Sequence, residues 1–351
     1  MKIDHLRAKL PESVDGALLF SEANRRYFTD FPSSNGALLL SRTDCVFLTD
    51  SRYTEAAQKQ ITFAETVDME QMEQEMSRLG LVNIALEARY VTLAHLKTLQ
   101  EAHPDKQFFY DESLDIAVEA LRMCKTPEEL ASICAAQRIA EAALERVLGL
   151  LKPGVTEREL ALELDFYMLK HGAEAISFDT IVLAGPNGSM PHGVPSDYKI
   201  QAGDFVTMDF GAVVDGYHSD MTRTVAIGSV SEEQRRVYDI VLEAQKRTLA
   251  VLAPGVTGKE ADAAGRDHIA ACGYGEFLGH GVGHGVGLDI HEEPHLSLKS
   301  EHWILAPDHV VTVEPAVYLP GRFGLRIEDM ALITEEGHEN LTHVPKELLL
   351  L

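Results

Sequence analysis

Four acidic residues stand inside apolar, strand-like stretches in the second half of the sequence. Asp209 ends the run FVTMD, and Asp220 follows eleven residues later, beyond an Asp-Gly turn. Glu314 lies in VVTVEPAV and Glu328 in LRIEDM. Ionised carboxylates are costly to bury without compensation, and they are hard oxygen ligands for divalent cations. We therefore expect these four acids to hold a cluster of cations.

Charge balance indicates the size of that cluster. Two divalent ions would neutralise four carboxylates, and one neutral imidazole would complete a set of five protein ligands. A dinuclear centre of this kind shares a water molecule, lowers its pKa towards about 7 and polarises a carbonyl, which is the chemistry of amide or ester hydrolysis. Oxygen-rich ligation with one histidine suits Mn²⁺, Co²⁺ or Fe²⁺ as well as Zn²⁺. We favour Mn²⁺ among these ions.

The stretch GHGVGHGVGLDIHEEPH, residues 279–295, contains four histidines and five glycines. Its last five letters match the HExxH signature of zinc proteases, which requires a helix. Pro294 would break such a helix, and no GxGxxG or Walker lysine supports a nucleotide site. A purely structural glycine-rich loop remains open for each histidine taken singly. Four histidines in one loop, beside four candidate metal acids, favour a catalytic role.

The elements that must position these groups predict an α/β (α+β) chain in two parts. In residues 1–121, strand-like runs cover 16–20, 36–40 and 45–48, and a helix is expected over 92–102. In residues 122–351, capping boxes predict helix starts; they stand at Thr126, Thr156, Ser231 and Thr257. Strands are predicted over 205–210, 222–227, 310–317 and 325–333.

An internal repeat links the two halves of the second part. The segment PGVTERE at 153–159 reappears as PGVTGKE at 254–260, and VTMD ending at Asp209 reappears as VTVE ending at Glu314. Helix starts and strands can look alike by chance, but order and spacing agree in both matches. We therefore expect a duplicated αβ unit with pseudo-twofold symmetry, which would bring Asp209 and Glu314 together.

Composition narrows the classes of partner and compartment. The chain has 351 residues, 45% of them hydrophobic, and a formal net charge of −24. This charge argues against nucleic acid and anionic membranes, which need clustered Lys and Arg. The amino terminus has no signal-like apolar region, and no apolar run approaches the roughly 20 residues of a membrane span. Four scattered cysteines indicate reduced thiols, so we expect a cytoplasmic protein.

The ordered set Asp209, Asp220, His284, Glu314 and Glu328 resembles the ligands of the pita-bread metallopeptidases, a family that includes methionine aminopeptidase, aminopeptidase P and prolidase. The resemblance extends over residues 122–351. In front of it, NRRY at 24–27 and DSRY at 50–53 look like the amino-terminal domain of the creatinase and prolidase branch. The resemblance implies an N-terminal α/β domain over 1–121 and a catalytic pita-bread domain over 122–351.

The resemblance also implies roles for individual residues. Asp209, Asp220, His284, Glu314 and Glu328 match metal ligands, and Glu314 also matches the proton acceptor for the attacking water. His291 matches a histidine that contacts the scissile group, and His192 one on the opposite side of the substrate. Arg326 matches an arginine that supports a metal-bound acid. His280 and His295 have counterparts near the substrate pocket.

Two features are similar to those of the Xaa-Pro branch of the family: the sequence HGVGHGVGL followed by HEEP, and the extra front domain. That branch cleaves the bond between an N-terminal residue and proline, so the substrate is a proline-containing peptide or dipeptide. We expect an Xaa-Pro aminopeptidase, with an Xaa-Pro dipeptidase (prolidase) as the alternative. A catalytically silent binding protein on the same fold is a second class. The resemblance further implies a homodimer.

Overall fold

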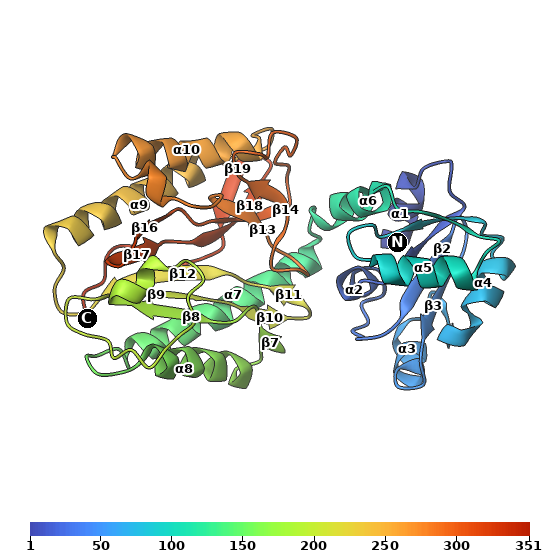
Figure 1. Cartoon of the computed structure of the whole chain (residues 1–351), viewed down its shortest axis with the longest axis horizontal. Coiled ribbons are helices and arrows are strands. Elements are labelled where there is room, and N and C mark those ends of the chain that lie inside the picture. Colours follow the sequence, from blue (N-terminus) through green and yellow to red (C-terminus); the bar gives the residue numbers. More distant parts are fainter. The chain divides into compact units, whose positions relative to one another are not determined.

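A computed structural model describes residues 1–351, and it divides into two compact units, Met1–Arg122 and Met123–Leu351 (Figure 1). We describe each unit by itself. No helix in either unit is both long and apolar enough to cross a lipid bilayer.

The first unit is built on one mixed sheet of six strands, in the order β4-β3-β2-β1-β5-β6. The strands are β1 (Gly16–Leu19), β2 (Ala37–Ser41), β3 (Cys45–Thr49), β4 (Glu65–Asp68), β5 (Asn83–Leu86) and β6 (Gln107–Phe109). The helices are α1 (Lys2–Lys9), α2 (Glu22–Thr29), α3 (Thr54–Gln60), α4 (Met72–Arg78), α5 (Leu93–Ala102) and α6 (Ser113–Arg122). Every residue of β1, β2 and β3 is buried, which explains why these strands read as unbroken apolar runs.

The NRRY motif of the first unit has a structural role around the start of α2. Asn24 donates a hydrogen bond to the buried carboxylate of Glu87 at 2.7 Å and accepts one from Arg122 at 2.8 Å. Glu87 also accepts from the Ser21 side chain and the Ser21 backbone. Arg25 is buried and donates to backbone carbonyl groups. The motif therefore ties α2 to the sheet.

The helices of the second unit begin where the capping boxes predicted. They are α7 (Pro127–Leu148), α8 (Glu157–Lys170), α9 (Glu232–Val251) and α10 (Gly258–Ala271). The caps are Thr126, Thr156, Ser231 and Thr257, and each side chain accepts a hydrogen bond from the backbone three residues later. An oxygen at this position satisfies a backbone donor that the helix itself leaves unpaired.

The predicted duplication is confirmed. In the first half, α7 and α8 accompany the sheet of β8 (Ile181–Ala184), β9 (Phe205–Phe210) and β12 (Met221–Ala226). In the second half, the paired helices α9 and α10 accompany the sheet of β13 (Gly283–Gly285), β14 (Glu292–Leu296), β15 (Val310–Val313), β18 (Asp329–Thr334) and β19 (Gly337–Asn340) (Figure 1). Equivalent bridges, Thr156 with Lys199 and Thr257 with Ile304, precede α8 and α10.

Short strands complete the second unit. One small sheet consists of β7 (Ala175–Ile176), β10 (Ala212–Val214) and β11 (Tyr217–His218), and another consists of β16 (Ala316–Leu319) and β17 (Phe323–Arg326).

The single strands predicted over 310–317 and 325–333 were therefore wrong in extent. The first is interrupted at Glu314, whose N–H bonds to the carbonyl of Val282, and the second at Glu328, whose N–H bonds to the carbonyl of Thr222. Both breaks redirect the chain at a candidate ligand.

Candidate metal centre

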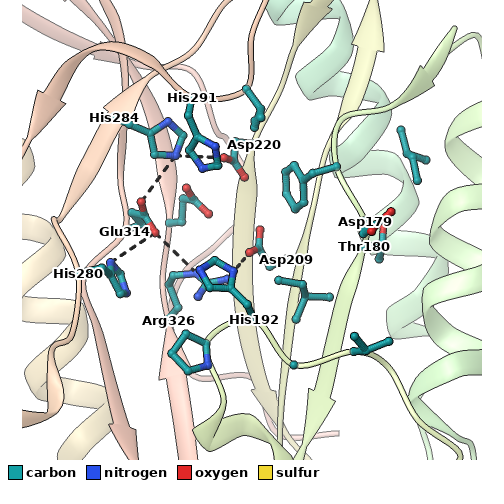
Figure 2. Close-up of a pocket in the computed structure, with 18 of the residues that line it drawn as sticks. Asp179, Thr180, His192, Asp209, Asp220, His280, His284, His291, Glu314 and Arg326 are labelled. Atoms are coloured by element: carbon teal, nitrogen blue, oxygen red, sulfur yellow. Dashed lines mark hydrogen bonds and ion pairs between the residues drawn. The ribbon is translucent and has the colours of Figure 1, made fainter. Parts of the chain in front are cut away.

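The five expected ligands line one cavity of about 810 Å³ in the second unit. They are Asp209, Asp220, His284, Glu314 and Glu328. The cavity is also lined by the other residues expected at the site: His192, His280, His291 and Arg326, which Figure 2 labels, and His295. The expected site residues, which are up to 136 positions apart in the sequence, from His192 to Glu328, thus meet around one space.

Strand ends deliver the four carboxylates. Asp209 lies on β9, where it pairs across the ladder with Thr222, and Asp220 directly precedes β12. Glu314 directly follows β15, and Glu328 lies in the break between β17 and β18. Each half of the repeat therefore contributes two acids, as the sequence repeat indicated for Asp209 and Glu314.

Asp220, His284 and Glu328 form the tightest group, because each offers one ligand atom and these atoms lie within 4.8 Å of one another. All three residues are buried. The Nε2 atom of His284 lies 3.6 Å from Asp220 Oδ2 and 3.6 Å from Glu314 Oε1. Asp209 is held on the other side by an ion pair with Arg326. Because Arg326 Nε also lies 3.9 Å from Glu314 Oε2, these contacts connect the five residues into one cluster.

Burial makes this cluster electrostatically unfavourable without added positive charge. Loss of hydration raises the pKa values of Asp220 and Glu328 well above their usual range, and neighbouring carboxylates raise them further. The pKa of Glu314 rises to about 8, again chiefly through burial. A bound cation would offset the repulsion and hold these groups ionised.

Two oxygen atoms support the fit of these donors to a cation. Asp209 Oδ1 and Asp220 Oδ1 are buried and have no hydrogen-bond partner in the protein. Buried polar atoms are almost always satisfied, so unpaired carboxylate oxygens at one site call for an ion. Four carboxylates and one imidazole are a donor set suited to Mn²⁺, Co²⁺, Fe²⁺ or Zn²⁺.

His284 is oriented as a ligand by its neighbours. Its Nδ1 lies 3.0 Å from the carbonyl oxygen of Gly285 and donates to it, so Nε2 carries the lone pair and faces the acids. Burial lowers the pKa of His284 to about 3, which keeps the ring neutral. The backbone N–H of His284 also donates to Thr312 Oγ1 at 3.1 Å. The ring is thereby fixed in the tautomer that binds a metal.

Arg326 forms hydrogen bonds that hold the acidic residues in position. Its guanidinium donates to the carboxylate of Asp209, to Thr222 Oγ1 at 2.9 Å and to the hydroxyl of Tyr318 at 2.6 Å. Thr222 in turn donates to Glu328 Oε2 at 2.6 Å.

Sequence reasoning missed Thr222 and Tyr318. The signal for Thr222 was its place two residues after Asp220, near the start of β12, whereas nothing local singled out Tyr318.

The remaining histidines surround the cavity. The rings of His291 and His284 are edge to face, with centroids 4.4 Å apart. His280 Nε2 lies 3.2 Å from the Tyr318 hydroxyl, and burial lowers the pKa of His280 to about 4. The HEEPH sequence is not helical: its last four residues belong to β14, which excludes the zincin geometry. His291 lies in the preceding loop.

Comparison with known proteins identifies the family of the chain. Residues 131–335 match the model of metallopeptidase family M24, and residues 2–124 match the creatinase/prolidase N-terminal domain. The chain belongs to metallopeptidase family M24. Members of this family depend on divalent metal ions, so the cluster of acids described above is its candidate metal site.

Individual relatives cover most or all of the chain. An Xaa-Pro dipeptidase of Pyrococcus furiosus is 42% identical over 238 residues, which is 68% of each chain. The solved structure of an Xaa-Pro dipeptidase from Bacillus anthracis has a TM-score of 0.96 at 43% identity, covering 100% of this chain and 99% of that one. An X-Pro aminopeptidase from Thermotoga maritima gives a TM-score of 0.88 at 37% identity, covering 96% and 98%. The pita-bread fold with a creatinase-type N-terminal domain is thereby confirmed.

Proposed function

We propose that this chain is a metal-dependent Xaa-Pro peptidase that hydrolyses Xaa-Pro dipeptides. The observation that carries the proposal is the buried convergence of four carboxylates and His284 on one cavity, with oxygen atoms left unpaired and histidines on its walls. The second class, a silent binding protein, is disfavoured because no member of this donor set is missing.

The sequence favoured an aminopeptidase acting on longer peptides, with the dipeptidase as the alternative. The relatives support the alternative, since the proteins from P. furiosus and B. anthracis are both named Xaa-Pro dipeptidase. The T. maritima structure carries the aminopeptidase name at lower identity, 37% against 43%. We therefore place the dipeptidase first and keep the aminopeptidase as the second candidate.

We assign the metal ligands to Asp209, Asp220, His284, Glu314 and Glu328, with two ions per chain and Mn²⁺ preferred. Bound cations of this type acidify a water molecule and polarise a carbonyl. In this proposal residues 1–121 form the creatinase/prolidase-like domain and residues 122–351 the catalytic domain. A homodimer and a cytoplasmic location complete the proposal; sedimentation and cell fractionation test them.

The side chains around the cavity supply the remaining chemistry. We assign Glu314 as the proton acceptor for the attacking water, since its carboxylate lines the cavity where the substrate would bind. His291 and His192 bind the scissile group from two sides, with His280 and His295 further along the walls. A histidine N–H can stabilise the tetrahedral oxyanion or protonate the proline nitrogen. Arg326 holds Asp209 in place and reacts with nothing itself.

Parallel assays test the proposal. The purified protein would be stripped of metal, reloaded with Mn²⁺ and given an Xaa-Pro dipeptide, an Xaa-Pro tripeptide and an Xaa-Ala dipeptide. We expect cleavage of the first at the highest kcat/KM and little cleavage of the third. Preference for the tripeptide would make the chain an aminopeptidase. The proposal that the chain is an enzyme would be refuted if the protein bound fewer than one transition-metal ion per chain and showed no metal-stimulated cleavage.

Asp220→Asn provides the control variant for these assays. It removes one ionised donor while keeping the shape of the side chain. We expect it to bind less metal and to lose activity towards the same dipeptide. Full activity in this variant would show that the observed cleavage comes from another site or from a contaminant.

A further inference from the structure

A buried ion pair outside the cavity links the start of the second unit to the histidine-rich segment. Lys125 Nζ lies 2.6 Å from Glu292 Oε1, and the side chains are only 1% and 9% exposed. The two residues are 167 positions apart in the sequence. Neither residue lines the cavity. Burying two charges costs free energy of desolvation, so a buried ion pair is only weak evidence for a gain in stability. We therefore consider whether this pair has a functional role.

Glu292 directly follows His291 and begins β14, where it pairs with Gly285 of β13. Residues 286–291 form the loop between these two strands, and His291 is its last residue. The Glu292 carboxylate packs against this loop, because a Cβ atom added to Gly287 would lie 2.2 Å from Glu292 Oε1. Gly287 therefore leaves room for the carboxylate beneath the loop.

The lysine is anchored at its other end. Its backbone N–H donates to the carbonyl of Asp308 at 2.9 Å, and Nζ also lies 3.3 Å from the carbonyl of Met123. The next residue, Thr126, is the cap of α7. Lys125 therefore lies directly before the cap of α7 and is held there by backbone hydrogen bonding. The 286–291 loop forms one more hydrogen bond, in which the N–H of His218 donates to the carbonyl of Gly287 at 2.8 Å.

We propose that Lys125 is a positioning residue: acting through Glu292, it holds the 286–291 loop so that His291 faces the scissile group. The inference rests on the proposed role of His291 in peptide cleavage. Removal of the ammonium would take from a buried carboxylate its ion-pair partner, and the carboxylate would move towards water and carry the loop with it. Small displacements of a catalytic group cost large factors in rate.

Three variants test the proposal. Lys125→Met removes the charge at similar length, and Lys125→Arg keeps a cationic donor. Lys106→Met is the matched control, because Lys106 has a side chain only 5% exposed and pairs with Asp105 at 3.0 Å in the first unit. Each variant would be measured for metal content, for kcat and KM on an Xaa-Pro dipeptide, and for amide hydrogen exchange across residues 283–296.

We expect Lys125→Met to lower kcat by about 10- to 100-fold with a smaller change in KM, unchanged metal content and faster exchange in residues 286–291. Lys125→Arg should recover most of the kcat, and Lys106→Met should match the wild type. A folded Lys125→Met protein with wild-type kcat and wild-type loop exchange would overturn the proposal. So would a loss confined to metal content, which would mean that Lys125 supports the ligands rather than His291.

Two measures keep the test decisive. If Lys125→Met does not fold, Glu292→Gln removes the charge from the other partner, and unchanged kcat with unchanged loop exchange in that variant would overturn the proposal. If the wild type cleaves no Xaa-Pro peptide, the proposed function fails, and this result comes from the wild type alone. Hydrogen exchange needs no substrate, so it still shows whether Lys125 holds the loop.

Discussion

Acidification should destabilise the second unit through one buried imidazole, His309. Its side chain lies beside β15 and is 3% exposed, and its Nδ1 accepts a hydrogen bond from the backbone N–H of Ala306 at 3.3 Å. Burial, with a smaller contribution from the positive charge of Lys125, lowers the pKa of His309 from its ordinary value of 6.5 to about 4. Protonation would also remove the acceptor that Ala306 uses.

The sign of the effect follows from proton binding. Between pH 6.5 and 4 the unfolded chain takes up a proton at this residue and the folded chain does not. Stability from His309 is therefore complete above pH 6.5 and is lost as the pH falls towards 4. The gap of 6.5 − 4 = 2.5 in pKa, at about 1.36 kcal/mol per pH unit, corresponds to about 3 kcal/mol.

The assay compares pH slopes rather than absolute stabilities. Free energies of unfolding would be measured by urea denaturation from pH 7.5 to 4.5, in EDTA so that metal release does not contribute. His309→Asn keeps a hydrogen-bond acceptor but no titrating ring, and its slope should be shallower than that of the wild type. Val310→Ala removes buried volume next to it and should keep the wild-type slope. Parallel curves for the wild type and His309→Asn would refute the reasoning.

Three further predictions concern the candidate metal centre. His291→Ala should lower kcat by about 10²-fold or more while the metal content stays the same; retained kcat would contradict the assigned role. Thr222→Val removes the donor to Glu328 and the acceptor for Arg326, so it should weaken metal binding by about 10- to 100-fold in a chelator competition assay. An unchanged Kd would show that the threonine does not tune the site. EDTA should lower the melting temperature and Mn²⁺ should restore it, since ligand at 100 times Kd stabilises by about 2.7 kcal/mol; a melting temperature insensitive to both would argue against a metal between the acids.

Sequence reasoning was most successful where the signal is local. The helix starts at Thr126, Thr156, Ser231 and Thr257 depend on a side chain that bonds to its own backbone three residues away, so a short motif predicts them. The strand over 205–210 was also predicted with its observed bounds, because its buried apolar residues stand together in the chain.

Sequence reasoning failed where strands change direction. Glu314 and Glu328 were read as lying within continuous strands, but the chain breaks at both. Their backbone N–H groups bond to Val282 and Thr222, 32 and 106 residues away, and no local pattern encodes such partners. The same reason hides the contact of Lys125 with Glu292, which are 167 residues apart.

The sequence by itself determined the types and order of the donor groups, the duplicated αβ pattern and the resemblance to a metallopeptidase family. These features are carried by residue chemistry and spacing along one chain. Only the tertiary structure decided which acids share a buried space, which carboxylate oxygens lack a hydrogen-bond partner and which residues hold the ligands in position through hydrogen bonds. Those properties arise when distant strand ends meet and water is excluded, because both the electrostatic cost of the acids and the need for a cation come from burial.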